Sequence, residues 1–216
     1  MLVCGLDEAG RGSIVGPLIV GGIAVEESSI SDLASLGVKD SKLLSARKRE
    51  ALYGGIVGLC HGVVALPIPT WEIDYYVTHG KKLRKLNYLE AIYMAKAVDR
   101  LSPQLVYADA SDTVARRFSE DITRNMKVSA KVIAEHHADS NYPVVSAASI
   151  IAKVVRDRTV QELRERFGDF GSGYPSDWRT IEFLRRWIER EGLIPRFCRS
   201  SWHTWLRIAQ LKLNET

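Results

Sequence analysis

The chain has 216 residues, of which 46% are hydrophobic, and its 30 Lys and Arg residues against 26 Asp and Glu residues give a formal net charge of +4. This length and composition can bury a sizeable core, which argues against intrinsic disorder and favours one domain with an appendage. The mild positive charge suits an anionic partner but does not establish one.

Cysteine usage and hydropathy limit the class of protein further. Cys4, Cys60 and Cys198 lie far apart and form no C-x-x-C pair, so neither a disulfide framework nor a zinc site is predicted. No run approaches the roughly 18 apolar residues of a membrane helix, and an acidic pair comes too early for a signal peptide. We therefore expect a soluble, cytoplasmic protein.

The first stretch, residues 2–13, contains the strongest local signal. An apolar run long enough for one buried strand ends in Asp7 and Glu8, and a loop with glycine on either side of Arg11 follows. Two carboxylates there repel by roughly 4 kcal/mol at 4 Å and an effective dielectric of about 20, unless a cation lies beside them. The alternative is that both acids face water. A P-loop is not predicted, because its lysine is replaced by Arg11 and its hydroxyl position by a glycine.

The next segments predict a hairpin and a helix start. Residues 17–25 indicate a second strand that pairs with the first and is bulged at the glycine pair 21–22. Ser45 is expected to begin a helix. Lys39 and Lys42 lie just before it, where they either bind a phosphate or are simply solvated.

Further along, residues 61–69 indicate a third strand. Apolar residues recur at helical spacing from 82 to 101, which predicts an amphipathic helix packed on the core. Residues 104–109 indicate a fourth strand that again ends in a carboxylate, Asp109. Asp112 is expected to cap the helix that follows.

Residues 131–137 indicate a fifth strand, and Asp139 supplies another acid just after it. His136 and His137 end this strand. Because neighbouring side chains on a strand point to opposite faces, we expect one histidine to be packed and the other exposed, rather than a catalytic pair.

A helix follows, on which Ser146, Ser149 and Lys153 share one face. The other side chains at the start of this helix are apolar and mostly small, so the shared face either contacts solvent or faces a ligand. From residue 167 a glycine-rich loop containing Tyr174 leads into helices near 177–190 and 200–213. A tyrosine in such a loop is either a turn anchor or a stacking surface for a sugar or base.

The order of these elements predicts an α/β fold with a mixed five-stranded sheet covered by helices on both faces. Neighbouring strand ends bring distant residues together in such sheets. We therefore expect four acids to converge at one edge: Asp7, Glu8, Asp109 and Asp139. Four acids need more than one cation, and two divalent ions about 3.5–4 Å apart suit in-line attack of water on a phosphodiester. Flanking basic residues would hold phosphates: Arg11, Lys39, Lys42 and Lys153.

Six segments, in order, resemble ribonuclease HII, closest to its archaeal form: 7–12, 40–42, 107–109, 138–139, 142–153 and 171–177. The resemblance spans about residues 1–205. It implies a ribonuclease H-like catalytic domain over 1–166 and a helical extension over 167–216 that contributes to substrate binding. It also implies an endonuclease that cuts the RNA strand of RNA–DNA hybrids, and cuts 5′ of single ribonucleotides in duplex DNA, leaving 3′-hydroxyl and 5′-phosphate ends.

By matching position, the resemblance implies that the four acids are catalytic and bind two Mg²⁺ or Mn²⁺ ions. It implies the following substrate-binding residues: Gly10, Arg11, Gly12, Lys42, Ser149, Lys153 and Tyr174. The loop 10–12 would read the 2′-hydroxyl through backbone contacts, Tyr174 would stack on the sugar beside the junction, and Lys42 would hold a phosphate.

The expected partners are RNA–DNA hybrid and ribonucleotide-containing duplex DNA, with no membrane, and the chain is expected to act as a monomer. Residues 210–216 lack the aromatic pair of a sliding-clamp peptide, so clamp binding is not expected. Two rival functions remain. One is a carboxylate-based DNA exonuclease or resolvase on the same fold, against which the loop 10–12 and Tyr174 argue. The other is a basic nucleic-acid-binding module without catalysis.

Overall fold

The computed structural model describes residues 1–38, 44–80 and 85–213. Five strands form one mixed sheet in the order β3-β2-β1-β4-β5. The strands are β1 (Leu2–Ala9), β2 (Leu18–Glu26), β3 (Gly62–Ile68), β4 (Leu105–Asp109) and β5 (Lys131–Glu135). β1 lies at the centre, antiparallel to β2 and parallel to β4, which is itself parallel to β5. The predicted mixed five-stranded sheet is confirmed.

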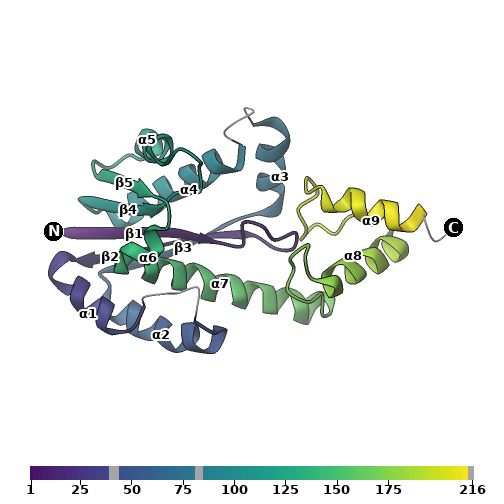
Figure 1. Ribbon diagram of the computed structural model, residues 1–216, viewed down its shortest axis with the longest axis horizontal. Coiled ribbons are helices and arrows are strands. Elements are labelled where there is room, and N and C mark those ends of the chain that lie inside the picture. Colours follow the sequence, from purple (N-terminus) through teal and green to yellow (C-terminus); the bar gives the residue numbers. More distant parts are fainter. Residues whose placement is uncertain (39–43, 81–84, 214–216) are drawn as a thin grey trace.

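Helices cover both faces of this sheet (Figure 1). The helices in the described part of the chain are α1 (Ile30–Ser35), α2 (Ala46–Leu59), α3 (Thr70–His79), α4 (Lys85–Leu101), α5 (Ala115–Asn125), α6 (Ala138–Asn141), α7 (Pro143–Phe167), α8 (Trp178–Glu191) and α9 (Thr204–Leu213), with a short 3₁₀ turn at Glu27–Ser29. α7 crosses one face against β1 and β2, with α1 and α2 beside it, whereas α4 packs on the other face together with α3 and α5. Each face has its own apolar cluster, so the core consists of two layers separated by the sheet.

Two glycines bring α7 unusually close to the central strands. A Cβ atom at Gly5 of β1 would overlap the carbonyl oxygen of Val144, and one at Gly21 of β2 would overlap that of Ala148. The helix backbone therefore lies directly on the sheet where side chains are absent. The bulge predicted at the glycine pair is wrong, since the β1–β2 register runs unbroken through Asp7↔Gly21. Gly21 serves the approach of the helix, not a break in the strand.

Helix starts follow the local sequence in part. α2 begins next to Ser45, as predicted, and the Ser45 side chain caps it by accepting a hydrogen bond from the Lys48 amide. The prediction for Asp112 is wrong in position, because Val114 occupies the N-cap of α5. The Asp112 carboxylate instead accepts the Val114 amide at 2.9 Å and pairs with Arg117, so it supports the helix start from further upstream.

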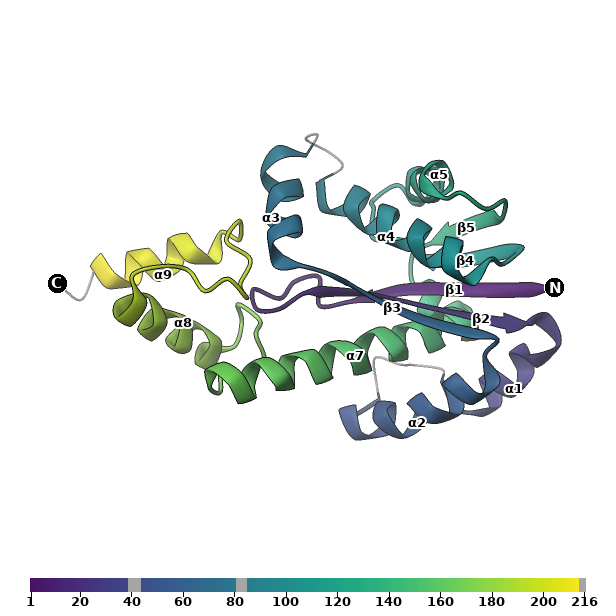
Figure 2. The same cartoon turned by 180° about the vertical axis from the view of Figure 1, so that it is seen from behind.

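The C-terminal helices α8 and α9 lie beyond the far end of α7, as both views show (Figures 1 and 2). A third apolar cluster connects them to the loop after β1 and includes Ile14, Phe170, Leu184 and Trp205. This cluster holds the glycine-rich loop before α8 against the loop after β1. Within the described ranges, no helix combines the length and apolar character needed to cross a bilayer. Cys4, Cys60 and Cys198 are free in the structure.

Candidate active site

Acids from different parts of the chain lie at one edge of the sheet, where β1 and β4 end. The parallel register pairs Leu6 with Ala108, so Asp7 and Asp109 follow at corresponding positions of neighbouring strands. Asp7 is nearly buried, and its Oδ1 atom accepts the amide of Glu8 at 2.7 Å. The sheet topology therefore brings together carboxylates that are about a hundred residues apart in sequence, as predicted from the strand ends.

The pKa values of these acids reflect their burial and their mutual repulsion. Burial raises the pKa of Asp7 well above its usual range, and the charges of Glu8 and Asp109 raise it further. Burial raises the pKa of Glu8 to about 8, and the neighbouring charges of Glu90 and Asp109 add to this rise while Arg11 opposes it. The acids therefore repel one another in a poorly solvated place, which favours either protonation or a nearby cation.

Asp139 is placed beside this group by the short helix α6. The amide of Ala138 donates to Asp109 Oδ1 at 2.8 Å, which ties the start of α6 to the end of β4. Asp139 is 3% exposed, and the Ser146 hydroxyl donates to its backbone carbonyl. Asp139 therefore directly follows Ala138, whose amide contacts Asp109.

The donor set fits a hard divalent ion. Carboxylate oxygens are the ligands that Mg²⁺ and Mn²⁺ prefer, and Glu8 Oε2 is buried without a hydrogen-bond partner in the described structure. Among the described residues, no three Asp, Glu, His or Cys side chains form a ready-made ion cage.

The loop after β1 lies against the Tyr174 loop. Gly10 has a φ of +91°, and a Cβ atom there would come within 2.8 Å of Arg156 Nε. A Cβ atom at Gly12 would meet the Tyr174 ring at 3.8 Å. The Arg156 guanidinium lies over the same ring, 4.8 Å from its centroid. The structure thus places Gly10, Gly12 and Tyr174 together, with an arginine that the sequence did not single out.

Arg199 anchors the loop from behind. It is completely buried, and its guanidinium donates to the carbonyls of Gly10, Arg11 and Gly16 at 2.7, 2.7 and 3.2 Å. Burial lowers the pKa of this guanidinium to about 10, which still leaves it charged at neutral pH. Sequence reasoning missed Arg199, because nothing in a stretch such as 197–204 identifies a distant backbone partner.

The Arg11 side chain does not point freely outward. It donates to the Glu90 carboxylate and to Asn87 Oδ1, both on α4. Glu90 was also missed, although the sequence carries a signal for it. An acid directly after Leu89, within the apolar stripe of an amphipathic helix, is exceptional unless something pairs with it.

Other predicted substrate-binding residues have different placements. Ser149 is completely buried and its hydroxyl hydrogen-bonds Asp7, so it reaches the site through that carboxylate. Lys153 is one turn further along α7 and half-buried. Lys42 and the rest of the 40–42 segment lie outside the described residues.

The expectation for the two adjacent histidines is wrong. β5 ends at Glu135, so His136 and His137 lie in a turn and both are exposed. His137 adopts the left-handed conformation with a φ of 60°. The alternation of a strand therefore does not apply to them.

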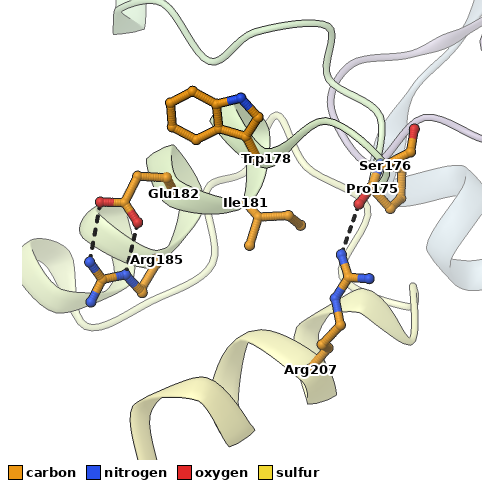
Figure 3. A pocket seen from close by; sticks show the side chains of 7 residues that line it. All are labelled: Pro175, Ser176, Trp178, Ile181, Glu182, Arg185 and Arg207. Carbon is orange, nitrogen blue, oxygen red and sulfur yellow. Dashed lines mark hydrogen bonds and ion pairs between the residues drawn. The ribbon is translucent and has the colours of Figure 1, made fainter. Parts of the chain in front are cut away.

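A pocket of about 560 Å³ lies next to the Tyr174 loop, between α8 and α9 (Figure 3). It is lined by Pro175, Ser176, Trp178, Ile181, Glu182, Arg185 and Arg207. Trp178 is 75% exposed, and Arg207 donates to the carbonyl of Pro175 at 2.8 Å. The pocket therefore combines an exposed indole with the side chains of Arg185 and Arg207, next to the Tyr174 loop.

Comparisons with known proteins give a consistent result. The family model described as ribonuclease HII matches residues 4–205. Ribonuclease HII from Pyrococcus abyssi is 43% identical over 212 residues, which covers 97% of this chain and 92% of that protein. The crystal structure of ribonuclease H2 from Pyrococcus horikoshii OT3 has a TM-score of 0.90 at 40% identity and covers all of both chains. RNase HII in the PCNA:RNase HII complex from Archaeoglobus fulgidus has a TM-score of 0.87 at 39% identity, covering 99% of this chain and 100% of that one.

Proposed function

Because the chain belongs to the ribonuclease HII family, we propose that it cuts duplex DNA on the 5′ side of an embedded ribonucleotide, leaving 3′-hydroxyl and 5′-phosphate ends. Membership makes it a hydrolase with a ribonuclease H-like fold that cleaves RNA in RNA–DNA hybrids. The observation that carries the finer proposal is the gathering of Asp7, Glu8 and Asp109 at one sheet edge, beside the loop 10–12.

In this proposal the four acids hold two divalent ions, Mg²⁺ or Mn²⁺. Asp7, Glu8 and Asp109 share one electrostatic environment, and Asp139 follows the residue that contacts Asp109. When bound, two such ions lower the pKa of the attacking water and stabilise the leaving 3′ oxygen. The raised pKa values of Asp7 and Glu8 support this assignment, since a cation relieves the repulsion that causes part of the rise.

Recognition of the ribonucleotide falls to the loop 10–12 and Tyr174. Without side chains at Gly10 and Gly12, backbone groups of the loop can approach the 2′-hydroxyl closely. The Tyr174 ring, flanked by Gly12 and Arg156, offers a face for the neighbouring sugar. Arg199 fixes the loop carbonyls, so these contacts are arranged before the substrate arrives.

Phosphates flanking the cut are assigned to Lys42 and Lys153, while Ser149 orients Asp7. The extension, residues 167–216, binds the duplex beyond the cut through the pocket that contains Trp178 and Arg207, and residues 1–166 perform the chemistry. RNase HII from Archaeoglobus fulgidus is described in complex with PCNA. Residues 210–216 of this chain contain no aromatic residue, and clamp binding stays outside the proposal.

The test is cleavage of a labelled DNA duplex that contains one ribonucleotide, with Mg²⁺, with Mn²⁺ and with chelator. We expect one cut on the 5′ side of the ribonucleotide, loss of cleavage with chelator, and no cutting of the all-DNA control. Asp7→Asn should abolish cleavage while preserving or raising duplex affinity, because a negative charge facing phosphate is removed.

Each rival function predicts a different outcome. An exonuclease or resolvase would degrade or cut the all-DNA control, whereas a binding module would cut nothing. The stacking role of Tyr174 is tested on the same duplex: Tyr174→Ala should lose more activity at a lone ribonucleotide than on a long RNA–DNA hybrid. An equal, small loss on both would show that the ring only anchors its loop.

A further inference from the structure

The guanidinium of Arg11 is held by α4 from one side of the acid group. One terminal nitrogen donates to Glu90 Oε2 and the other to Asn87 Oδ1. Glu90 is 0% exposed, whereas about a third of the Arg11 side chain remains accessible. A buried carboxylate without a paired cation is costly, so Arg11 offsets part of the cost of burying Glu90.

The restraint extends beyond these three residues. Asn87 Nδ2 donates to Asp112 Oδ2 at 3.1 Å, and Asp112 in turn binds Arg117 and the start of α5. The backbone carbonyl of Arg11 is fixed separately by Arg199. Arg11 is therefore fastened at its main chain and at the tip of its side chain.

The contacts that hold Arg11 matter because Arg11 lies close to Glu8. It follows Glu8 by three residues and lies close enough that its charge favours ionisation of Glu8. Glu8 Oε2 is buried and has no hydrogen-bond partner in the described structure. A guanidinium pairs with carboxylates in a bidentate fashion. If released from α4, Arg11 would therefore have an unpartnered carboxylate oxygen of Glu8 three residues away along the chain.

We propose that Glu90 is a positioning residue that holds the Arg11 guanidinium away from Glu8 and so keeps the acid group open to a divalent cation. Without Glu90, Arg11 occupies the acid group as an internal cation and competes with the metal. This inference rests on the proposed function, because it takes the acids to be the metal-binding groups.

The test is a double-mutant cycle in which Mn²⁺ binding is followed by the electron paramagnetic resonance signal of the free ion, without substrate. We expect Glu90→Gln to weaken Mn²⁺ binding about tenfold. In the Arg11→Ala background, the same Glu90→Gln change should have little effect, because the competing cation is gone. This dependence on Arg11 is a signature that a purely structural role of Glu90 does not produce.

Two results would overturn the inference. Glu90→Gln could bind Mn²⁺ as tightly as wild type. Alternatively, it could weaken binding by the same factor in both backgrounds, which would show that the charge of Glu90 acts through space. If Glu90→Gln does not fold, Asn87→Ala removes the other acceptor and should give a smaller loss that also vanishes in the Arg11→Ala background. Equal losses in both backgrounds would again overturn the inference.

Two controls separate this inference from the proposed function. Asp121→Asn removes another buried carboxylate that pairs with an arginine, on α5, and should lower thermal stability without changing Mn²⁺ affinity. Asp7→Asn should weaken Mn²⁺ binding whether or not Glu90 positions Arg11. If Asp7→Asn bound Mn²⁺ like wild type, both the inference and the metal assignment would fail. If Asp7→Asn weakened binding but the effects of Glu90→Gln and Arg11→Ala were additive, the inference would fail and the metal assignment would stand.

Discussion

At the scale of single residues, Asp7 and Glu8 stabilise the metal-free fold better when protonated than when charged. Burial and the charge of Glu90 raise the pKa of Glu8 from 4.5 to about 8. An acid whose pKa is higher in the folded than in the unfolded chain contributes stability that is fully present below its unfolded pKa. That contribution is lost as the pH rises through its folded pKa. The relevant window for Glu8 is therefore from about pH 4.5 to about pH 8.

This window gives a prediction for the chelated protein. The melting temperature of wild type should fall more steeply between pH 5 and pH 8 than that of Glu8→Gln, which cannot ionise, as checked by thermal unfolding in chelator. Glu120→Gln, on the exposed side of α5, should follow the wild-type curve. Parallel curves for wild type and Glu8→Gln would contradict the raised pKa of Glu8.

Site residues that lie in recognisable local patterns could be predicted from the sequence, whereas polar contacts between residues far apart in the chain could not. The position of Asp109 beside Asp7 follows from strand ends in a mixed sheet, and Tyr174 does lie against Gly12. The links from Arg11 to Glu90 and from Arg199 to the loop join residues about 80 and 190 positions apart. No spacing rule predicts such pairs, because the fold alone determines which side chains meet.

At the scale of elements, the packing of α7 on β1 and β2 positions the site. The helix carries Ser149 to Asp7 and Arg156 to Tyr174, and it can do so only because Gly5 and Gly21 leave room for its backbone. The strands and most helices were predicted from hydropathy and caps. The role of Gly21 was not, since a glycine in a strand signals a bulge and a close helix equally well.

We predict that Gly5→Ala and Gly21→Ala each destabilise the protein by about 1–3 kcal/mol or more, because the added methyl group meets helix backbone that cannot move aside. Gly54→Ala is a matched control, since a Cβ atom at this α2 position meets nothing within 4 Å. It should stabilise the protein by about 0.4–1 kcal/mol. Chemical denaturation measures all three, and wild-type stability of Gly5→Ala would contradict the packing described.

At the scale of the whole molecule, the loop between β1 and β2 joins the sheet to α8 and α9. Ser13 donates to the carbonyl of Gly173, and Ile14 and Val15 bind the same carbonyl through their amides. Composition predicted a helical extension after residue 167, and helices are present there. How tightly it joins the loop could not be predicted, because the third apolar cluster mixes residues from both ends of the chain.

If the extension binds the duplex, Trp178→Ala should weaken duplex affinity by about fivefold or more, because a stacking surface is lost. The turnover rate at saturating substrate should stay near wild type, since the acids are untouched. Trp178→Phe, which keeps an aromatic face, should bind almost as well as wild type. Titration of a labelled duplex in chelator gives the affinities, and unchanged binding by Trp178→Ala would remove this pocket from the interface.

The central claim is that carboxylates distant in sequence bind divalent ions together at the edge of the sheet. The most direct measurement is the anomalous scattering of Mn²⁺ in crystals grown with the ion. We predict anomalous peaks about 2.1 Å from carboxylate oxygens of Asp7, Glu8 and Asp109, with these side chains rotated toward the ion. Peaks confined to other places, with the three carboxylates ordered and unliganded, would contradict the account.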